Sequence, residues 1–249
     1  MKPIIVFDID GVIRDVSGSY RRALADTVEK FTQGNYRPTM EDIDTLKSEG
    51  LWNNDWEASW ELCLRYWQSQ GIIPNLDYNE LVAFFQSRYR GTNPVDWDGY
   101  ITTEPLLATK AYFEELTNQE ILWGFFSGAT RGSAEYVLHQ RIGLNNPVLV
   151  AMEDAPGKPD PTGLFRVVAE LATELTPVIY VGDTVADMYT VTAAKKQENE
   201  RQWIGVGIIP PHLHSHPEQH QVQLLAAGGT IVLDAVEKLT IEVIKDLLQ

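Results

Sequence analysis

Two patterns of hydrophobic residues alternate along the 249-residue chain, and each predicts a different kind of element. Short apolar runs bounded by polar residues or glycine predict buried strands of a parallel sheet. These runs lie at residues 3–10, 121–126, 148–151, 178–181, 203–208 and 230–233. Stretches with helical spacing lie between them at 106–116, 132–140, 161–172 and 188–196, and another follows the last strand. Strands that alternate with helices of this length predict right-handed βαβ units on one sheet.

The segment between the first strand and the second has no strand-like run. It contains helical patterns at residues 19–31, 39–47, 54–70 and 78–89, and glycine, proline and asparagine separate them. We therefore expect an inserted helical domain. The predicted organisation is an α/β fold with a Rossmann-like parallel sheet flanked by helices over residues 1–16 and 92–249, and an all-helical cap over residues 17–91.

Charge and composition exclude several classes of partner. The chain has 35 acidic and 20 basic residues, a net charge of −15, which disfavours binding to nucleic acid or to anionic lipid. No apolar run is long enough to span a bilayer, and the first residues, MKPIIVFDID, do not resemble a signal peptide. The single cysteine, Cys63, excludes an intrachain disulfide and is compatible with a reducing compartment. We expect a cytoplasmic protein that binds neither nucleic acid nor membranes.

Polar and charged residues follow four of the predicted strands where each strand ends. They are Asp8 and Asp10, Ser127 and Gly128, Lys158, and Asp183 and Asp187. Each one alone is an ordinary turn or cap residue. Because the carboxyl ends of parallel strands meet at one edge of a sheet, we expect these residues to lie together.

The residue types at this edge suit one kind of chemistry. Clustered carboxylates repel one another without a cation, and carboxylate oxygens favour Mg²⁺. Lys158 adds a positive charge, and Ser127 with nearby backbone N–H groups provides donors for phosphoryl oxygens. The sequence therefore predicts metal-assisted phosphoryl transfer.

Four segments resemble, in order, the motifs of the haloacid dehalogenase (HAD) superfamily. They are FDIDGVI (7–13), FFSGAT (125–130), GKPDP (157–161) and VGDTVAD (181–187). The resemblance covers residues 1–15 and 99–249, and the helical insert lies where subfamily I carries its C1-type cap. It implies a phosphatase-like hydrolase.

The resemblance also implies roles for individual residues. Asp8 would be the nucleophile that forms an aspartyl-phosphate, and Asp10 would protonate the leaving oxygen and then activate water. Ser127 and Gly128 would bind the phosphoryl group, and Lys158 would stabilise both the nucleophile and the phosphoryl charge.

The same resemblance implies a bound Mg²⁺. Its ligands would be Asp8, the backbone carbonyl of Asp10, and Asp183, with Asp187 as a further ligand or a supporting partner. The implied reaction is Mg²⁺-dependent hydrolysis of a small phosphorylated metabolite, and the sequence does not specify which ester.

Other reactions of the superfamily and a non-enzymatic role are the alternatives. Asp10 disfavours haloacid dehalogenation, since dehalogenases lack this second aspartate. Phosphonatases use a lysine of the cap, and the predicted cap has only Lys30 and Lys47, neither marked out by its context. A phosphomutase of the β-phosphoglucomutase type remains the first alternative, and a non-catalytic binding protein is the second.

The predicted cap and the loops contain weaker candidates. Trp52, Asn53, Asn54 and Asp55 form a connecting segment that could contact the leaving group, although Asn54 or Asp55 could equally cap the next helix. Trp56, Trp60, Cys63 and Trp67 share one helical face, for which a place in the core of the cap is expected.

Basic residues outside the motifs complete the candidate set. Arg14 and Arg131 follow the first two motifs and could bind substrate oxygens or form surface ion pairs. His212, His214, His216 and His220 lie in a Pro-flanked segment that we interpret as a solvated loop, because their spacing is not that of a zinc site.

Overall fold

The computed structural model describes residues 2–49, 51–52, 54–172 and 174–249, and they form two compact units. The first unit consists of residues 1–15 and 106–249 and contains the sheet. The second consists of Val16–Pro105 and is helical. In both, the predicted type of structure is observed: a parallel α/β core and an all-helical insert.

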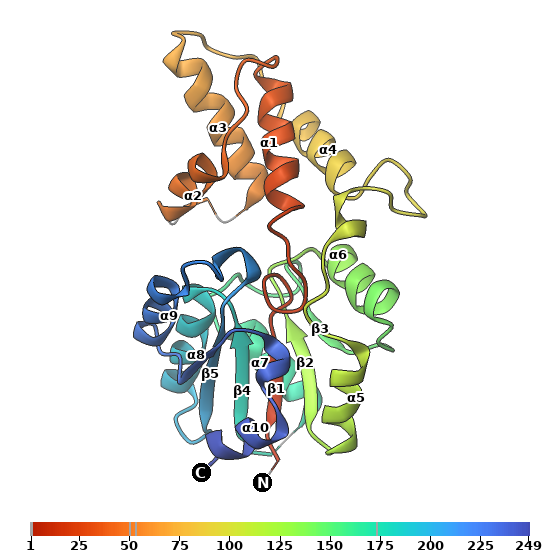
Figure 1. The fold of residues 1–249 in the computed structure, drawn as a ribbon, viewed down its shortest axis with the longest axis vertical. Helices are drawn as coiled ribbons and strands as arrows, with labels where there is room; N and C mark the ends of the chain where they lie inside the picture. Colours follow the sequence, from red (N-terminus) through yellow and green to blue (C-terminus); the bar gives the residue numbers. More distant parts are fainter. Residues whose placement is uncertain (1, 50, 53, 173) are drawn as a thin grey trace. The chain divides into compact units, whose positions relative to one another are not determined.

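The core unit is built on one parallel sheet (Figure 1). Among the described residues its strand order is β3-β2-β1-β4-β5-β6. The strands are β1 (Ile4–Phe7), β2 (Leu122–Phe126), β3 (Val148–Val150), β4 (Val178–Gly182), β5 (Trp203–Ile208) and β6 (Ile231–Leu233). β1 lies between β2 and β4, so the order reverses direction at β1. In sheets of this kind, ligands bind beyond the carboxyl end of the strand at the reversal.

The strands end level with one another near this reversal. Phe7 pairs with Phe125 on one side and with Val181 on the other. The Asp8 N–H donates to the Val181 carbonyl at 2.8 Å, and the Ser127 N–H donates to the Val150 carbonyl at 3.0 Å. The residues that follow these strands therefore start at the same edge.

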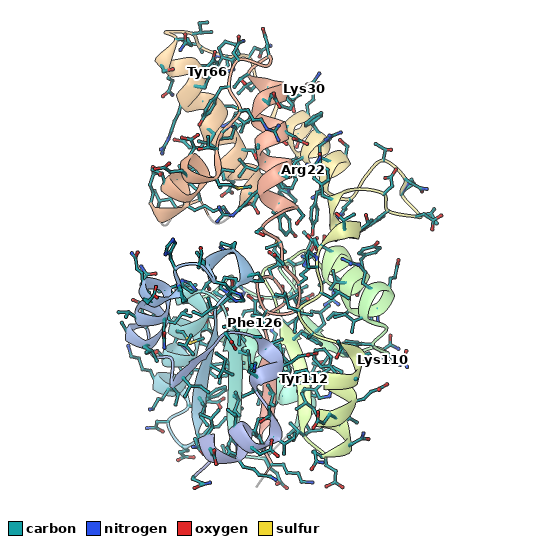
Figure 2. The ribbon with its side chains drawn as sticks, viewed as in Figure 1. Arg22, Lys30, Tyr66, Lys110, Tyr112 and Phe126 are labelled. Atoms are coloured by element: carbon teal, nitrogen blue, oxygen red, sulfur yellow. The ribbon has the colours of Figure 1, made fainter. Side chains whose placement is uncertain are left out.

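Helices cover both faces of the sheet. They are α5 (Lys110–Asn118), α6 (Arg131–Glu135), α7 (Thr162–Leu171), α8 (Val185–Gln197), α9 (Pro217–Ala226) and α10 (Ile241–Leu247). Ile4 and Val6 of β1 pack in the cluster that contains buried residues of α7 and α8. The next residue, Phe7, contacts Tyr112 and Phe113 of α5 edge-on. This alternation follows from the period of two along a strand, and Figure 2 labels Tyr112 on α5 and Phe126 on β2.

The helical unit contains α1 (Tyr20–Phe31), α2 (Met40–Ser48), α3 (Asp55–Ser69), α4 (Tyr78–Tyr89) and the 3₁₀ turn η1 (Tyr100–Thr103). Side-chain caps start three of these helices. Thr39 accepts from the Asp42 N–H, Asn54 from the Trp56 N–H, and Asp77 from the Asn79 and Glu80 N–H groups. Such caps satisfy N–H groups that have no partner within the helix. The α1 helix packs against both α3 and α4.

The boundary after the helical unit lies later than predicted. Residues 92–105 cluster with the helical unit, and the core resumes at Leu106 rather than at residue 92. The reason is local, because the N–H groups of Asp98 and Gly99 donate to the Arg90 carbonyl at 3.2 and 3.0 Å. The loop thus folds back on the end of α4, which the polar sequence GTNPVDWDGY does not reveal.

Three helices of the core also differ from their predicted form. α5 begins at Lys110 instead of residue 106, because Leu106 forms a bridge with Arg14 and Thr109 caps the helix. The helix predicted at 132–140 is α6 followed by a π-helical stretch, Tyr136–Ile142, that ends at Gly143 with φ of 83°. The segment predicted as a histidine-rich loop contains α9, so His220 is helical.

The tryptophan face of α3 is only partly core. Cys63 is fully buried, but the buried residues of α3 are Ala58, Ser59, Leu62 and Cys63, whereas the tryptophans are half-buried at its flanks. Trp60 contacts Tyr78 edge-on, and the Trp67 Nε1–H donates to the Phe31 carbonyl at 3.1 Å. The bulky rings therefore link α3 to α1 and α4 at the margins of the unit.

Candidate active site

Asp8 and Lys158 form a buried ion pair at the carboxyl end of β1. Lys158 Nζ lies 2.7 Å from Asp8 Oδ2, and the Ile9 N–H donates to Asp8 Oδ1 at 2.7 Å. Burial raises the pKa of Asp8 to about 7, against the opposing charge of Lys158, and nearby Asp187 and Asp10 add to the rise. The Asp8 carboxylate is therefore held in one orientation and needs local positive charge to stay ionised.

Asp8, Asp183 and Asp187 form a compact group of acids. Each offers a carboxylate oxygen, and these oxygens all lie within 4.8 Å of one another. Asp8 and Asp187 are buried and Asp183 is half-buried. Burial, together with the charges of Asp187 and Asp8, raises the pKa of Asp183 well above its ordinary value. An all-oxygen group of close acids is a suitable site for a hard divalent cation.

Asp187 is fixed more firmly than the other two acids. Its Oδ1 accepts from Lys158 Nζ at 2.7 Å and from the Tyr180 hydroxyl at 3.0 Å, while its Oδ2 accepts from the Thr184 N–H at 2.9 Å. Although burial opposes it, Lys158 and Thr184 lower the pKa of Asp187. Asp8 also has protein partners on both oxygens, but Asp187 accepts more hydrogen bonds, from Lys158, Tyr180 and Thr184, which suits a residue that supports the metal ligands.

Gly11 lets Asp183 reach the site. Its φ of +75° lies in the left-handed region, and a Cβ at this position would lie 2.0 Å from Asp183 Oδ2. Only glycine provides both the backbone conformation and the space. The turn after β1 and the acid after β4 are thus packed directly against each other.

Asp10 lies in the turn after β1, and its partner is Arg14. Asp10 Oδ1 accepts from Arg14 Nε and Nη2, both at 2.7 Å. The Arg14 side chain has no exposed surface. The predicted contact of Arg14 with substrate oxygens does not fit this position, because the guanidinium lies inside the core and is directed at Asp10.

Ser127 and Gly128 lie at the end of β2, at the same edge as Asp8. Ser127 is buried, and its Oγ accepts from the Ala129 N–H at 3.1 Å. A Cβ on Gly128 would meet no atom within 4 Å, so the space beside this residue is open. A fixed hydroxyl beside open space next to a glycine backbone is suited to an incoming phosphoryl group.

The weaker candidates that lie within the described residues have partners in their own unit. Arg131 pairs with Glu135 and Asp154. The Trp52 Nε1–H donates to Glu49, Asn54 caps α3, and Asp55 pairs with Lys47 at 2.8 Å. The capping role that was the alternative for Asn54 is therefore observed, and the contact of this segment with a leaving group stays a prediction. Asn53 lies outside the described residues.

Three residues that contact these acids were not predicted as site residues. Thr184 and Asp187 form a reciprocal capping box, and the pattern Thr-x-x-Asp before a helix is a signal that could have identified it. Tyr180 donates to Asp187 from within β4, where a buried tyrosine hydroxyl needs a partner. His220 donates to the Asp183 carbonyl from α9, and no local pattern indicates that contact.

Comparisons with known proteins agree with this geometry. Residues 3–195 match the haloacid dehalogenase-like hydrolase family. The chain is 31% identical over 186 residues to an imidazoleglycerol-phosphate dehydratase from Phytophthora nicotianae. That match covers 74% of this chain but only 40% of the relative, so the chain spans less than half of that protein's length.

Solved structures show the same fold at low identity. A phosphonoacetaldehyde hydrolase-like protein from Oleispira antarctica matches with a TM-score of 0.71 and 19% identity, covering 99% of this chain and 92% of the other. The phosphatase Tt82 from Thermococcus thioreducens matches with a TM-score of 0.64 and 23% identity, covering 82% and 92%. The family match spans most of the chain and all four motifs, so this protein belongs to the haloacid dehalogenase-like hydrolases.

Proposed function

We propose that this protein is a Mg²⁺-dependent phosphatase that hydrolyses a small phosphorylated metabolite through an aspartyl-phosphate on Asp8. The observation that carries the proposal is the buried group of Asp8, Asp183 and Asp187, with Lys158 bound between two of them. Three close acids and one lysine leave negative charge uncompensated in a site of low exposure. A bound divalent cation would compensate this negative charge, and it would also allow an anionic phosphate ester to bind beside the acids.

The donor set fits Mg²⁺. Asp8, Asp183 and the backbone carbonyl of Asp10 would hold the ion, and Asp187 would support them, because its oxygens already accept from Lys158, Tyr180 and Thr184. When bound, Mg²⁺ supplies positive charge that compensates the carboxylates and the phosphoryl oxygens.

The residues of the chain account for both halves of the reaction. The Asp8 carboxylate attacks phosphorus and the bond to the leaving alkoxide breaks, while Asp10 gives that oxygen a proton. Asp10 then takes a proton from a water molecule that attacks the phosphorus, and the bond to Asp8 breaks to release phosphate. Ser127, the backbone at Gly128 and Lys158 bind the phosphoryl oxygens throughout.

The surroundings of the cap lysines favour phosphate esters over phosphonates. A Schiff-base mechanism needs an unprotonated amine beside the substrate. Lys47 is paired with Asp55 at 2.8 Å, and Lys30 lies exposed at the end of α1 (Figure 2). Neither lies in the buried, charge-poor surroundings of a Schiff-base lysine. We propose a cytoplasmic site of action, with which the single, buried Cys63 is compatible.

A phosphatase assay tests the proposal. We expect release of phosphate from an aryl phosphate and from at least one member of a metabolite panel with Mg²⁺, and loss of that release with a chelator. Asp8→Asn should lower the rate by several orders of magnitude, while Asp246→Asn, at an exposed position of α10 outside the four motifs, serves as the matched control.

Two results would decide against the phosphatase. An isomeric sugar phosphate formed only with a bisphosphate activator would indicate a phosphomutase. Full activity in Asp8→Asn would remove the nucleophile.

A further inference from the structure

His220 contacts the candidate site from outside the four motifs. Its Nε2 lies 2.7 Å from the backbone carbonyl oxygen of Asp183, although the two residues are 37 positions apart. A carbonyl oxygen only accepts hydrogen bonds, so Nε2 carries the hydrogen and donates. His220 therefore donates a hydrogen bond to the backbone of Asp183, which is a metal ligand in the proposed function.

The Asp183 carbonyl requires a partner of this kind. Thr184 is the N-cap of α8, and its own carbonyl accepts from Asp187 and Met188 within the helix. Asp183 precedes the cap, so its carbonyl lies outside the helical hydrogen-bond pattern. The His220 donor satisfies this carbonyl and thereby fixes the direction of the peptide group. The Asp183 side chain packs against Gly11.

The α9 helix, which carries His220, is packed against the core unit. Leu224 and Ala227 follow it by four and seven positions, so the three residues share one face of the helix. Leu224 and Ala227 pack with Met188 of α8 and with Ile209 in one buried cluster. The Thr192 hydroxyl of α8 also donates to the Ala227 carbonyl at 3.1 Å. His220 is thus anchored to the helix that follows Asp183.

We propose that His220 is a positioning residue that holds the Asp183 loop in its metal-binding conformation. This inference rests on the proposed function, because it requires Asp183 to be a ligand. His220 does not touch the substrate or the metal in this role; it sets the affinity for Mg²⁺ through the Asp183 backbone.

Calorimetric titration of the metal-free protein with Mg²⁺ tests this role without turnover. His220→Leu removes the donor and should weaken Mg²⁺ binding about ten-fold, the lower end of what loss of a partner behind a metal ligand costs. His220→Asn is too short to reach the carbonyl and should resemble leucine. His220→Gln keeps an N–H donor at similar reach and should restore affinity to within about three-fold of wild type.

His214 provides a matched control in the same segment. Its Nε2 also donates to a backbone carbonyl, that of Ile209 at 2.9 Å, but that contact does not involve the acids. His214→Leu should leave the Mg²⁺ affinity unchanged. Thermal unfolding of each metal-free variant checks that the core is folded.

The outcomes separate the inference from the function on which it rests. Wild-type affinity in both His220→Leu and His220→Asn would overturn the inference, and so would equal weakening in His214→Leu. If the leucine variant does not fold, the comparison of Asn with Gln decides, and equal affinities would overturn the role of the donor. A wild-type protein that binds no Mg²⁺ at all would overturn the proposed function itself.

Discussion

Gly11 sets a strict requirement on residue type in the candidate site. Its φ of +75° favours glycine, and the Asp183 carboxylate occupies the space where any side chain would begin. Gly34 has a similar φ of +79°, but a Cβ there would meet no atom within 4 Å. A substitution at Gly34 therefore costs backbone strain alone, whereas the same substitution at Gly11 also displaces the Asp183 carboxylate.

Alanine substitutions at these two glycines should have different effects. Gly34→Ala should cost about 1–2 kcal/mol of unfolding free energy from backbone strain alone and leave Mg²⁺ binding intact. Gly11→Ala should add to this strain a displacement of Asp183, and weaken Mg²⁺ binding on the order of ten-fold. Urea unfolding and calorimetric titration measure the two effects. Unchanged Mg²⁺ affinity in Gly11→Ala would contradict the assignment of Asp183.

The positions of individual site residues could be predicted where the residue directly follows a strand of the parallel sheet. Asp8 and Asp183 follow adjacent parallel strands, so the sheet alone brings them together. The burial of Arg14 was not predictable, because it depends on the path of the turn after β1. The partner of His220 was also not predictable, since helix α9 brings it to Asp183 from a distant part of the sequence.

At the scale of elements, the same kind of N-terminal capping box begins both α2 and α8, but it has a different role in each helix. Thr39 and Asp42 bond reciprocally at the start of α2, and Thr184 and Asp187 do so at the start of α8. Asp42 lies on the surface of the helical unit. Asp187 is buried and also accepts from Lys158, so this cap orients part of the candidate site.

Removing the two caps should distinguish these purposes. Thr39→Ala and Thr184→Ala should each cost about 1 kcal/mol of stability, because each loses an N-cap hydroxyl. Only Thr184→Ala should also weaken Mg²⁺ binding and lower phosphatase activity, since Asp187 loses one of its fixed partners. Chemical unfolding with parallel activity assays makes the comparison. Equal loss of activity in both variants would show that the effect is merely destabilisation.

Asp26 joins several elements of the helical unit and predicts a dependence of stability on pH. It lies on α1 and accepts from Arg37, from Arg88 of α4 and from Tyr100 of η1. Although partial burial opposes it, these hydrogen bonds lower the pKa of Asp26 below its ordinary value of 3.8. The ionised form therefore stabilises the folded state above pH 3.8, and this contribution is lost as the pH falls through the lowered pKa.

The Asp26→Asn variant should show that dependence. It should be less stable than wild type by on the order of 2 kcal/mol at neutral pH, where charged hydrogen bonds are lost. The difference should shrink as the pH falls below 3.8. Glu29→Gln, which loses an exposed partner of Arg37, should change stability little. A difference that grows towards acid pH in urea unfolding would contradict the assignment.

Elements were predictable in proportion to the share of their residues that is buried. β1 and β4 are fully buried, and their unbroken apolar runs identify them. In α9, Leu224 is the buried residue, and most of the other positions are polar. The helical period is therefore weak in the sequence, and the histidines and prolines suggested a loop. The fold-back of residues 92–105 likewise depends on backbone hydrogen bonds, which leave no apolar pattern.

At the scale of the whole molecule, the site concentrates negative charge in a protein that is already acidic. The chain has a net charge of −15, and the group of Asp8, Asp183 and Asp187 lies at low exposure. Burial and mutual repulsion raise the pKa of Asp8 and of Asp183, so their ionised forms oppose the folded state unless a cation binds in addition to Lys158. No helix within the described residues has the length and apolar character to cross a membrane.

Removing one acid should therefore change stability in opposite directions with and without metal. In a chelator, Asp183→Asn should be at least as stable as wild type, because it relieves repulsion in the buried group. With Mg²⁺ at a hundred times its dissociation constant, wild type should gain about 2.7 kcal/mol by linkage and become the more stable protein. Denaturant unfolding under both conditions tests this reversal. Equal responses to Mg²⁺ in the two proteins would argue against a metal at this group.

The most direct test of the central claim is to locate the phosphoryl group during turnover. The reaction with an aryl phosphate and Mg²⁺ is quenched in acid, and the protein is reduced with borohydride, which converts an aspartyl-phosphate to homoserine. Peptide mass spectrometry then identifies the modified residue. We expect homoserine at position 8 and nowhere else. Rapid turnover with unmodified Asp8, or homoserine at another aspartate, would contradict the account.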